Sequence, residues 1–310
     1  MFLVCGEALF DFFLESEAGP AAATYAARAG GSPFNVAIGL KRLERDSGLL
    51  TGLSSDLLGQ RLVQVLEAEG VSMRYAIPTD RPTTLSLVGL DAAGVPAYQF
   101  YDNGSADTGV LEADLPTLGT EVVGLHFGSY SLAAAPVADA MAALARAKAG
   151  RFVSLDPNVR PTVEPDMDIW RERLAVLFPL ADLVKISAED LELLWPGMRS
   201  EALAADLISM GVALVVVTDG GEAATGWTSG GLRATATPPR VKVVDTVGAG
   251  DTFQAALLAR LLRDPAGPKT ALAGLDSARL AALVDYAARA AAITCSRRGA
   301  DLPRASELTD

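Results

Sequence analysis

Short apolar runs rich in β-branched residues alternate along the chain with longer Ala- and Leu-rich stretches whose apolar residues recur at helical spacing. Runs of the first kind predict buried strands, and stretches of the second kind predict helices. The strand candidates are 2–4, 49–52, 122–127, 151–155, 183–186, 213–218 and a strand-like run at 241–244, and the helix candidates are 35–43, 57–69, 135–149, 169–177, 188–194, 201–210, 252–263 and 279–295. This alternation predicts an α/β fold with a mostly parallel sheet and helices on both faces.

Two segments, 12–29 and 84–101, interrupt this rhythm with strand-like alternation and no helix signal. Within the second, 85–90 and 96–101 flank the turn Asp91-Ala92-Ala93-Gly94, which predicts a β-hairpin. We therefore divide the chain into a main α/β unit (1–11, 30–83 and 102–310) and two β segments (12–29 and 84–101). The two segments would form a lid over an active site, an edge extension of the sheet or a dimer contact, and one small sheet could serve more than one of these roles.

Composition and charge narrow the function. The 310 residues, half of them hydrophobic, are enough to bury a large core. The formal net charge of −12 argues against nucleic acid as a partner. Two cysteines, Cys5 and Cys295, give no disulfide framework and favour a cytoplasmic location. The apolar start of the chain lacks a basic region and is followed at once by Glu7 and Asp11, so we expect a buried strand rather than a signal peptide, and no apolar run has the length of a membrane span.

The segment Asp245-Thr246-Val247-Gly248-Ala249-Gly250-Asp251-Thr252-Phe253 opens a predicted helix. The N–H groups at a helix start can hold an anion, and the small residues Gly248, Ala249 and Gly250 let phosphate oxygens approach them closely. Asp251 beside an anion makes chemical sense if it meets a hydroxyl that is about to attack phosphorus. The alternative is a carboxylate that only complements the helix dipole. The segment therefore predicts a phosphoryl-transfer site with its own base.

A second motif, Gly30-Gly31-Ser32-Pro33-Phe34-Asn35-Val36-Ala37, lies near the N-terminus, and Asp11 precedes it just past the first strand. The glycine pair permits close backbone approach to a ligand, and Asn35 can donate and accept hydrogen bonds. A carboxylate and a carboxamide together suit a neutral polyhydroxylated substrate. Asn35 as a plain helix cap and Asp11 as a turn residue are the alternatives.

Together and in this order, the two motifs resemble the two signatures of the ribokinase-like (PfkB) carbohydrate kinases, and the similarity covers essentially the whole chain. The segments Phe100-Tyr101, Ala106-Asp107 and Asp156-Pro157-Asn158-Val159-Arg160-Pro161 are most similar to the bacterial fructokinases of that family. The resemblance implies a three-layer α/β/α sandwich with a mostly parallel central sheet and a small β-sheet lid.

The resemblance also implies roles for individual residues. Asp251 would be the general base, and Gly248, Ala249 and Gly250 would form the anion hole. Asp11, Gly31 and Asn35 would bind sugar hydroxyls, and Arg160 would reach the sugar or the phosphate, unless it is a surface ion-pair partner. Phe100 would shield the sugar from water or simply pair across the hairpin. Lys185, Thr218 and Gly220 would lie along ATP, together with Gly248 and Gly250.

Two ion sites follow from the same resemblance. The family's Asn-x-x-Glu motif, which is linked to Mg²⁺, appears here as Ser187-Ala188-Glu189-Asp190, so either Asp190 or Glu189 would organise Mg²⁺ through water. Asp245 and Val247, with Gly299 in the 294–299 loop, resemble a monovalent-cation site that would take K⁺.

These observations predict a cytoplasmic, ATP-dependent sugar kinase that acts on fructose to give fructose 6-phosphate, with a possible homodimer through the lid and no nucleic-acid or membrane partner. A 2-keto-3-deoxygluconate kinase of the same fold is the nearest alternative. A nucleoside kinase would be expected to carry more aromatic residues than the 6% present. A sugar- or nucleotide-binding regulator that has lost catalysis belongs to a different class, and the retention of Asp251 and the anion-hole residues argues against it.

Overall fold

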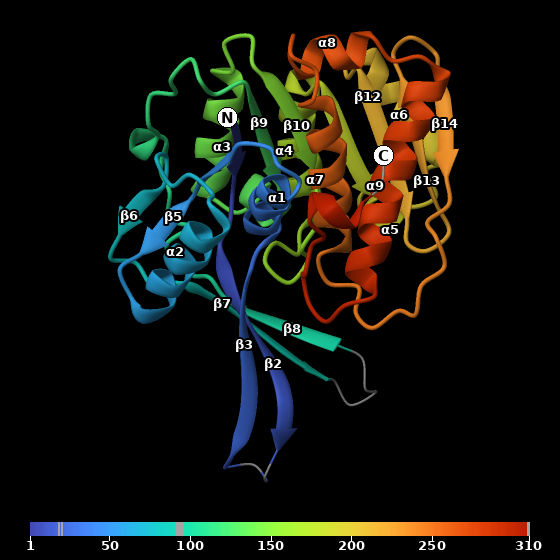
Figure 1. The fold of residues 1–310 in the computed structure, drawn as a ribbon. Helices are drawn as coiled ribbons and strands as arrows, with labels where there is room; N and C mark the ends of the chain where they lie inside the picture. Colours follow the sequence, from blue (N-terminus) through green and yellow to red (C-terminus); the bar gives the residue numbers. More distant parts are fainter. Residues whose placement is uncertain (18, 20, 91–95, 309–310) are drawn as a thin grey trace.

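An eight-stranded sheet forms the centre of the molecule (Figure 1). The computed structural model describes residues 1–17, 19, 21–90 and 96–308. The strand order is β14-β13-β12-β11-β10-β9-β1-β4, and all neighbours from β12 to β4 are parallel, whereas β12, β13 and β14 are antiparallel. The strands are β1 (Phe2–Cys5), β4 (Ser47–Leu50), β9 (Gly124–Gly128), β10 (Phe152–Asp156), β11 (Leu183–Ser187), β12 (Leu214–Asp219), β13 (Ala223–Thr228) and β14 (Arg233–Ala236).

Helices cover both faces of this sheet, as the sequence pattern predicts. One layer holds α1 (Ser32–Arg42), α2 (Leu57–Glu69), α7 (Ala249–Leu261), α8 (Pro268–Ala273) and α9 (Ser277–Cys295), and the other holds α3 (Val137–Arg146), α4 (Met167–Leu177), α5 (Ala188–Leu194) and α6 (Ser200–Ser209). Short 3₁₀ turns lie at Glu112–Asp114, Ser129–Leu132, Phe178–Leu180 and Ala305–Glu307. Along β1, Phe2 and Val4 join the core under the first layer, while Leu3 and Cys5 join the core under the second. The period of two in a strand thus builds two separate hydrophobic cores.

A separate four-stranded sheet projects from the lower end of the main body (Figure 1). Its order is β3-β2-β7-β8, from β2 (Leu9–Glu17), β3 (Ala23–Gly30), β7 (Thr84–Leu90) and β8 (Pro96–Tyr101), and its central pair, β2 and β7, is parallel. A two-stranded ladder joins β5 (Gly52–Ser54) to β6 (Ile77–Thr79). The predicted hairpin turn 91–94 lies outside the described residues. Because β2 begins at Leu9, Asp11 belongs to this small sheet and not to the main unit in which the sequence-based division put it.

The predicted fold class is confirmed, and the differences concern particular segments. The run 241–244 is wrong as a strand: it has no regular structure, and Val243 and Val244 are exposed. Its valines suit a strand, but the segment pairs with no strand, and Val244 instead donates its N–H to the carbonyl of Cys295 at 2.8 Å. The parallel pairing of β2 with β7 joins segments far apart in the chain, so local patterning could not reveal it.

Within the described part of the chain, no helix is both long enough and apolar enough to cross a membrane.

Candidate active site

Asp251 lies in the first turn of α7 and is held from two sides by the start of α1. Ser32 Oγ donates to its Oδ1 at 2.6 Å, and Asn35 Nδ2 donates to its Oδ2 at 2.8 Å. The carboxylate is 7% exposed. Burial raises the pKa of Asp251 above its usual value, and the bonds from Ser32 and Asn35 oppose that rise. The two sequence motifs therefore meet, some 200 residues apart in the chain, at one oriented carboxylate.

The glycine pair before α1 is required by close contacts. Gly31, at the N-cap of α1, has φ 107°, and a Cβ there would lie 2.8 Å from the carbonyl oxygen of Glu7. A Cβ on Gly30 would lie 2.7 Å from Asp11 Oδ2. A side chain at either position would displace the strand end or the carboxylate, so the pair lets β1, β2 and α1 converge on the site.

The turn before α7 forms the proposed anion hole. Gly248 caps the helix in the left-handed region, at φ 78°. The N–H of Ala249 is already bonded to the carbonyl of Thr246 at 3.2 Å, so this group is not free for an anion in the structure. A Cβ on Gly250 would lie 3.1 Å from Lys185 Nζ, which places an ammonium group directly beside the helix start. Both the amino end of α7 and the ammonium group of Lys185 therefore contribute positive potential at the proposed anion hole.

Lys185 is held there by Asp156 at the end of the neighbouring strand β10. Their side chains form an ion pair of 2.8 Å and are 4% and 1% exposed. Burial alone would lower the pKa of Lys185, but the nearby carboxylates of Asp156, Asp190 and Asp251 outweigh it and raise the pKa. Lys185 therefore stays charged beside Gly250, at the phosphate end of the nucleotide region predicted for it.

Three carboxyl groups, Asp11, Glu7 and Asp251, and one arginine, Arg160, belong to the region where the sequence predicts sugar binding. Asp11 lies in β2, and burial raises its pKa to about 6. Glu7, just after β1, accepts a hydrogen bond from the Ser32 N–H at 3.2 Å, and burial raises its pKa to about 8. The positive charge of Arg160 partly opposes the rise that burial causes in the pKa values of Glu7, Asp11 and Asp251. The guanidinium is partly buried and donates to the carbonyl of Val159 at 3.0 Å. Its contact with the sugar or the phosphate stays a prediction.

Phe100, on β8, meets the ring of Tyr130 edge-on, with centroids 5.9 Å apart. Tyr130 donates its hydroxyl proton to Asp107 Oδ2 at 2.5 Å, and Asp107 also accepts from Thr84. The buried carboxylate of Asp107 thus supports the aromatic pair. This contact joins the small sheet to the segment after β9.

The nucleotide candidates lie along the adjoining strand ends. Thr218 lies near the end of β12 and stands in register with Ser187 at the end of β11. Gly220 follows β12 with φ 48°. This edge continues from Lys185 in β11. It is the carboxyl edge of the parallel strands, where α/β folds bind ligands.

The two residues predicted to organise Mg²⁺ differ in burial. Glu189 is exposed, whereas Asp190 is 6% exposed and accepts the Val159 N–H at 2.9 Å through Oδ1. The second oxygen of Asp190 fits a role through water, because Mg²⁺ keeps several waters and takes few carboxylates beside substrate phosphates. In the described part of the chain, no group of three or more His, Cys, Asp and Glu residues could hold a metal ion by itself.

The three residues of the predicted monovalent-cation site lie together. Asp245 accepts the Val247 N–H at 3.1 Å and the Gly299 N–H at 2.8 Å. The loop after α9 is therefore fastened to the turn that carries the anion hole.

Sequence reasoning missed three residues of this site: Ser32, Glu7 and Asp156. Ser32 lies within a quoted motif, but only the approach of α1 to α7 shows that it binds Asp251. The signal for Asp156 was its place at the end of a predicted strand beside the one that carries Lys185.

Comparison with known proteins identifies the family. The sequence profile of the pfkB family carbohydrate kinases matches residues 1–307. A fructokinase of Rhizobium leguminosarum bv. trifolii is 41% identical over 283 residues, which cover 90% of this chain and 85% of that protein. The chain belongs to the pfkB family of carbohydrate kinases, which transfer a phosphoryl group to an alcohol.

Solved structures of fructokinases have the same overall fold as this chain. The crystal structure of a fructokinase with bound ATP from Xylella fastidiosa superposes with a TM-score of 0.91 at 27% identity, and the match covers 99% of this chain and 96% of that one. A fructokinase from Vibrio cholerae O395, with fructose, ADP and calcium ion bound, gives a TM-score of 0.80 at 26% identity, over 97% and 94% of the two chains.

Proposed function

We propose that this chain is an ATP-dependent fructokinase, which transfers the γ-phosphoryl group of ATP to the primary hydroxyl of fructose and forms fructose 6-phosphate. The observation that carries the proposal is the Asp251 carboxylate, oriented by Ser32 and Asn35 at the start of α7. Fructokinases with ATP or fructose bound share this fold over nearly the whole chain.

The geometry supports a direct transfer. Asp251 accepts the proton of the sugar hydroxyl as the oxygen attacks phosphorus, and its hydrogen bonds to α1 hold it in place for that step. The amino end of α7 and the Lys185 ammonium group stabilise the charge that develops on the transferred phosphoryl group. Asp11, Gly31, Asn35 and Arg160 are proposed to position the sugar, with Phe100 limiting the access of water.

Charge supports a neutral sugar over 2-keto-3-deoxygluconate. The carboxylate of that substrate would need a cation with free charge at the sugar end. Asp11 and Asp251 are near enough to Arg160 for its positive charge to favour their ionised forms, so part of that charge is balanced within the protein. Adding a substrate carboxylate would bring like charges together at a cost that neutral fructose avoids.

Two ions belong to this proposal. Mg²⁺ bound with ATP would be organised by Asp190 through water and would neutralise phosphate charge. A monovalent cation, proposed as K⁺, would lie near Asp245, Val247 and Gly299, where it would support the turn of the anion hole. The nucleotide would extend from Gly248 and Gly250 past Lys185 to Thr218 and Gly220.

Asp251→Asn tests the base directly. The amide keeps the size of the side chain but cannot take the proton, so turnover should fall by roughly 10²–10⁴-fold. Fructose binding, measured by calorimetry, should stay near wild type. Because burial raises the pKa of Asp251, wild-type turnover should increase as pH rises through that pKa. Turnover within a few-fold of wild type in the variant contradicts the assignment.

A substrate panel separates the remaining functions. ADP release should be measured with fructose, ribose, 2-keto-3-deoxygluconate and adenosine. Fructose is expected to give the highest kcat/KM. Binding of a sugar in a thermal-shift assay without ADP release from any of the four would indicate a catalytically silent regulator instead.

Two features of the cellular context stay predictions. A homodimer through the small sheet is proposed because that sheet projects from the main body (Figure 1), and sedimentation showing only monomers at micromolar concentration would exclude it. The cytoplasmic location predicted from the two unpaired cysteines needs fractionation of cells.

A further inference from the structure

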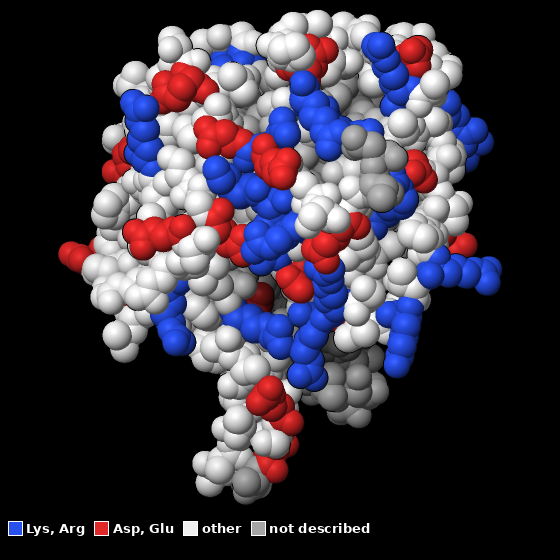
Figure 2. Space-filling model, viewed as in Figure 1, with Lys and Arg blue, Asp and Glu red and all other residues white. Residues whose placement is uncertain are grey.

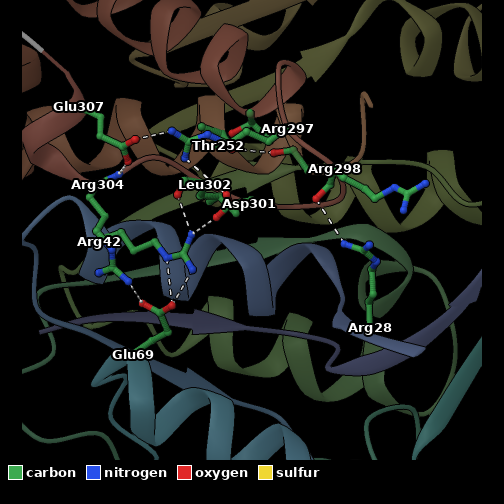
Figure 3. A network of polar contacts seen from close by, with 12 residues as sticks. Arg28, Arg42, Glu69, Thr252, Arg297, Arg298, Asp301, Leu302, Arg304 and Glu307 are labelled. Atoms are coloured by element: carbon green, nitrogen blue, oxygen red, sulfur yellow. Dashed lines mark hydrogen bonds and ion pairs between the residues drawn. The ribbon is translucent and has the colours of Figure 1, made fainter. Parts of the chain in front are cut away.

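Arg28, on β3 of the small sheet, reaches the loop that follows α9 (Figure 3). Its Nη1 donates to the main-chain carbonyl of Arg298 at 3.3 Å. A Cβ on Gly299 would lie 2.8 Å from the same nitrogen, so the guanidinium lies directly on this glycine. Gly299 is buried, although the loop lies at the surface. One side chain of the small sheet therefore rests on the loop 297–301.

That loop is in contact with the turn of the anion hole. The N–H of Gly299 donates to Asp245 Oδ2 at 2.8 Å. A Cβ on Gly248 would lie 2.6 Å from the Cβ of Ala300, so loop and turn are packed without a gap. A shift of the loop would move the N-cap of α7 or open a void beside it.

Arg28 is also tied to the sugar end. In the ladder between β2 and β3, Arg28 stands directly opposite Asp11. Residues directly opposite each other project from the same face of a sheet. A sugar that holds Asp11 therefore also restrains the part of β3 from which Arg28 extends.

The loop is anchored independently on its other side. Arg42 of α1 donates to Asp301 Oδ1 at 2.8 Å and to the carbonyl of Leu302 at 2.7 Å, and Arg297 pairs with Glu307 (Figure 3). These contacts all lie within the main unit. Arg28 brings to the loop a contact from the small sheet.

We propose that Arg28 is a positioning residue that couples sugar binding at the small sheet to the geometry of the anion hole. The proposal rests on the proposed kinase function, because it requires a sugar at Asp11 and a phosphoryl group at α7. When a sugar holds β2 and β3 against the main unit, Arg28 presses the loop against Gly248 and Asp245. Arg28 is assigned no contact with the reacting atoms and acts through the loop.

Binding thermodynamics provide the test. The Kd of a non-hydrolysable ATP analogue with Mg²⁺ is measured by calorimetry with and without saturating fructose, and the ratio is the coupling factor. In the wild type it should lie in the range of about 5–150 that is usual for coupled sites, and it must be the same when fructose is titrated with and without the analogue. In Arg28→Ala the factor should approach 1, while each ligand alone binds as in the wild type.

Turnover gives a second readout. In Arg28→Ala, kcat should fall by roughly tenfold to a hundredfold, the cost of a misplaced catalytic group. Arg28→Lys keeps a donor and should retain part of the coupling. Arg61→Ala, which removes an exposed arginine on α2, is the matched control and should leave both coupling and turnover unchanged. If Arg28→Ala does not fold, Arg28→Gln carries the same test.

The outcomes are distinct. Wild-type coupling in Arg28→Ala overturns the proposal, and so does a wild type that phosphorylates fructose without any coupling. A wild-type chain that neither binds nor phosphorylates fructose overturns the proposed function first, and the coupling proposal with it.

Discussion

Glu7 shows at the scale of one residue how burial links this site to pH. Its usual pKa of 4.5 rises to about 8 in the folded chain because the carboxyl group is fully buried. Between these values the folded protein keeps a proton that the unfolded chain releases. The free energy of unfolding should therefore be highest below the lower value and should fall as pH rises toward the higher one.

Glu7→Gln should flatten this dependence, because an amide stays neutral and its oxygen can still accept from the Ser32 N–H. Each unit of difference in pKa corresponds to about 1.4 kcal/mol, so the wild type should lose a few kcal/mol over the interval that the variant keeps. Urea unfolding at a series of pH values measures this. Glu15→Gln, at an exposed position, should follow the wild type, and an unchanged slope in Glu7→Gln would show that Glu7 does not hold the proton.

The candidate base could be proposed from the sequence because the pattern around it is local. Asp251 follows three small residues at a helix start, and that pattern has a physical meaning by itself. The hydrogen-bond partners of Asp251 could not be predicted in this way, because Ser32 and Asn35 reach it only through the packing of α1 against α7. The sequence predicts that Asn35 binds sugar, whereas in the structure its amide donates to Asp251, the proposed base, so the sugar contact of Asn35 stays a prediction.

At the scale of elements, α2 depends on a cap that also ties down the small sheet. Asp56, at its N-cap, accepts the N–H groups of Leu58 and Gly59 at 3.0 and 2.7 Å. The same carboxylate accepts the Thr83 N–H and hydroxyl at 2.8 and 2.7 Å, directly before β7. One side chain thus fixes the start of a helix and the entry to a strand.

Asp56→Ala should therefore lower the free energy of unfolding by more than the loss of an ordinary helix cap does. Losing the cap costs about 1 kcal/mol, and the two bonds to Thr83 should bring the total to roughly 2–3 kcal/mol. Asp276→Ala at the exposed N-cap of α9, where the side chain accepts the Arg279 N–H and forms an exposed ion pair of 3.7 Å with the Arg279 guanidinium, should cost about 1 kcal/mol. Urea unfolding compares the two variants, and equal losses would mean that the Thr83 contacts contribute nothing.

Elements with a strong period and clear ends could be predicted, and those whose structure depends on distant contacts could not. The predicted helix 57–69 agrees with α2 because Asp56 caps its start and Gly70 ends it at φ 73°. The predicted helix 135–149 is shorter in the structure, Val137–Arg146, because Pro136 stands at its N-cap and the helix already ends at the C-cap Ala147. The run 241–244 has strand-forming residues, but the strand order gives it no neighbour.

At the scale of the whole molecule, Lys and Arg side chains form a band down one face, although the chain is acidic overall, and a hollow lies at its lower end where the small sheet meets the main body (Figure 2). Arg42 belongs to the network of Figure 3 that joins three distant parts of the chain. It pairs with Glu69 of α2 at 2.6 Å and with Asp301 near the C-terminus at 2.8 Å. The arginine thus closes the N-terminal and C-terminal parts of the chain onto each other.

Arg42→Met should show what that closure contributes. The side chains of Arg42 and Glu69 are 17% and 14% exposed, so removing the arginine leaves a largely buried carboxylate without its main partner. Breaking a fully buried pair costs about 3–5 kcal/mol, and the remaining solvent contact should reduce this to roughly 2–3 kcal/mol. Arg74→Met provides the comparison: the side chains of Arg74 and Glu121 are 65% and 38% exposed, so solvent screens this pair and its loss should change the stability little. Urea unfolding of both variants measures the difference.

If Arg42→Met unfolds at the same urea concentration as Arg74→Met, the contacts of Arg42 do not stabilise either end of the chain. If it is destabilised as expected, the contacts of Arg42 with Glu69 and Asp301 contribute to the stability that joins the two ends of the chain.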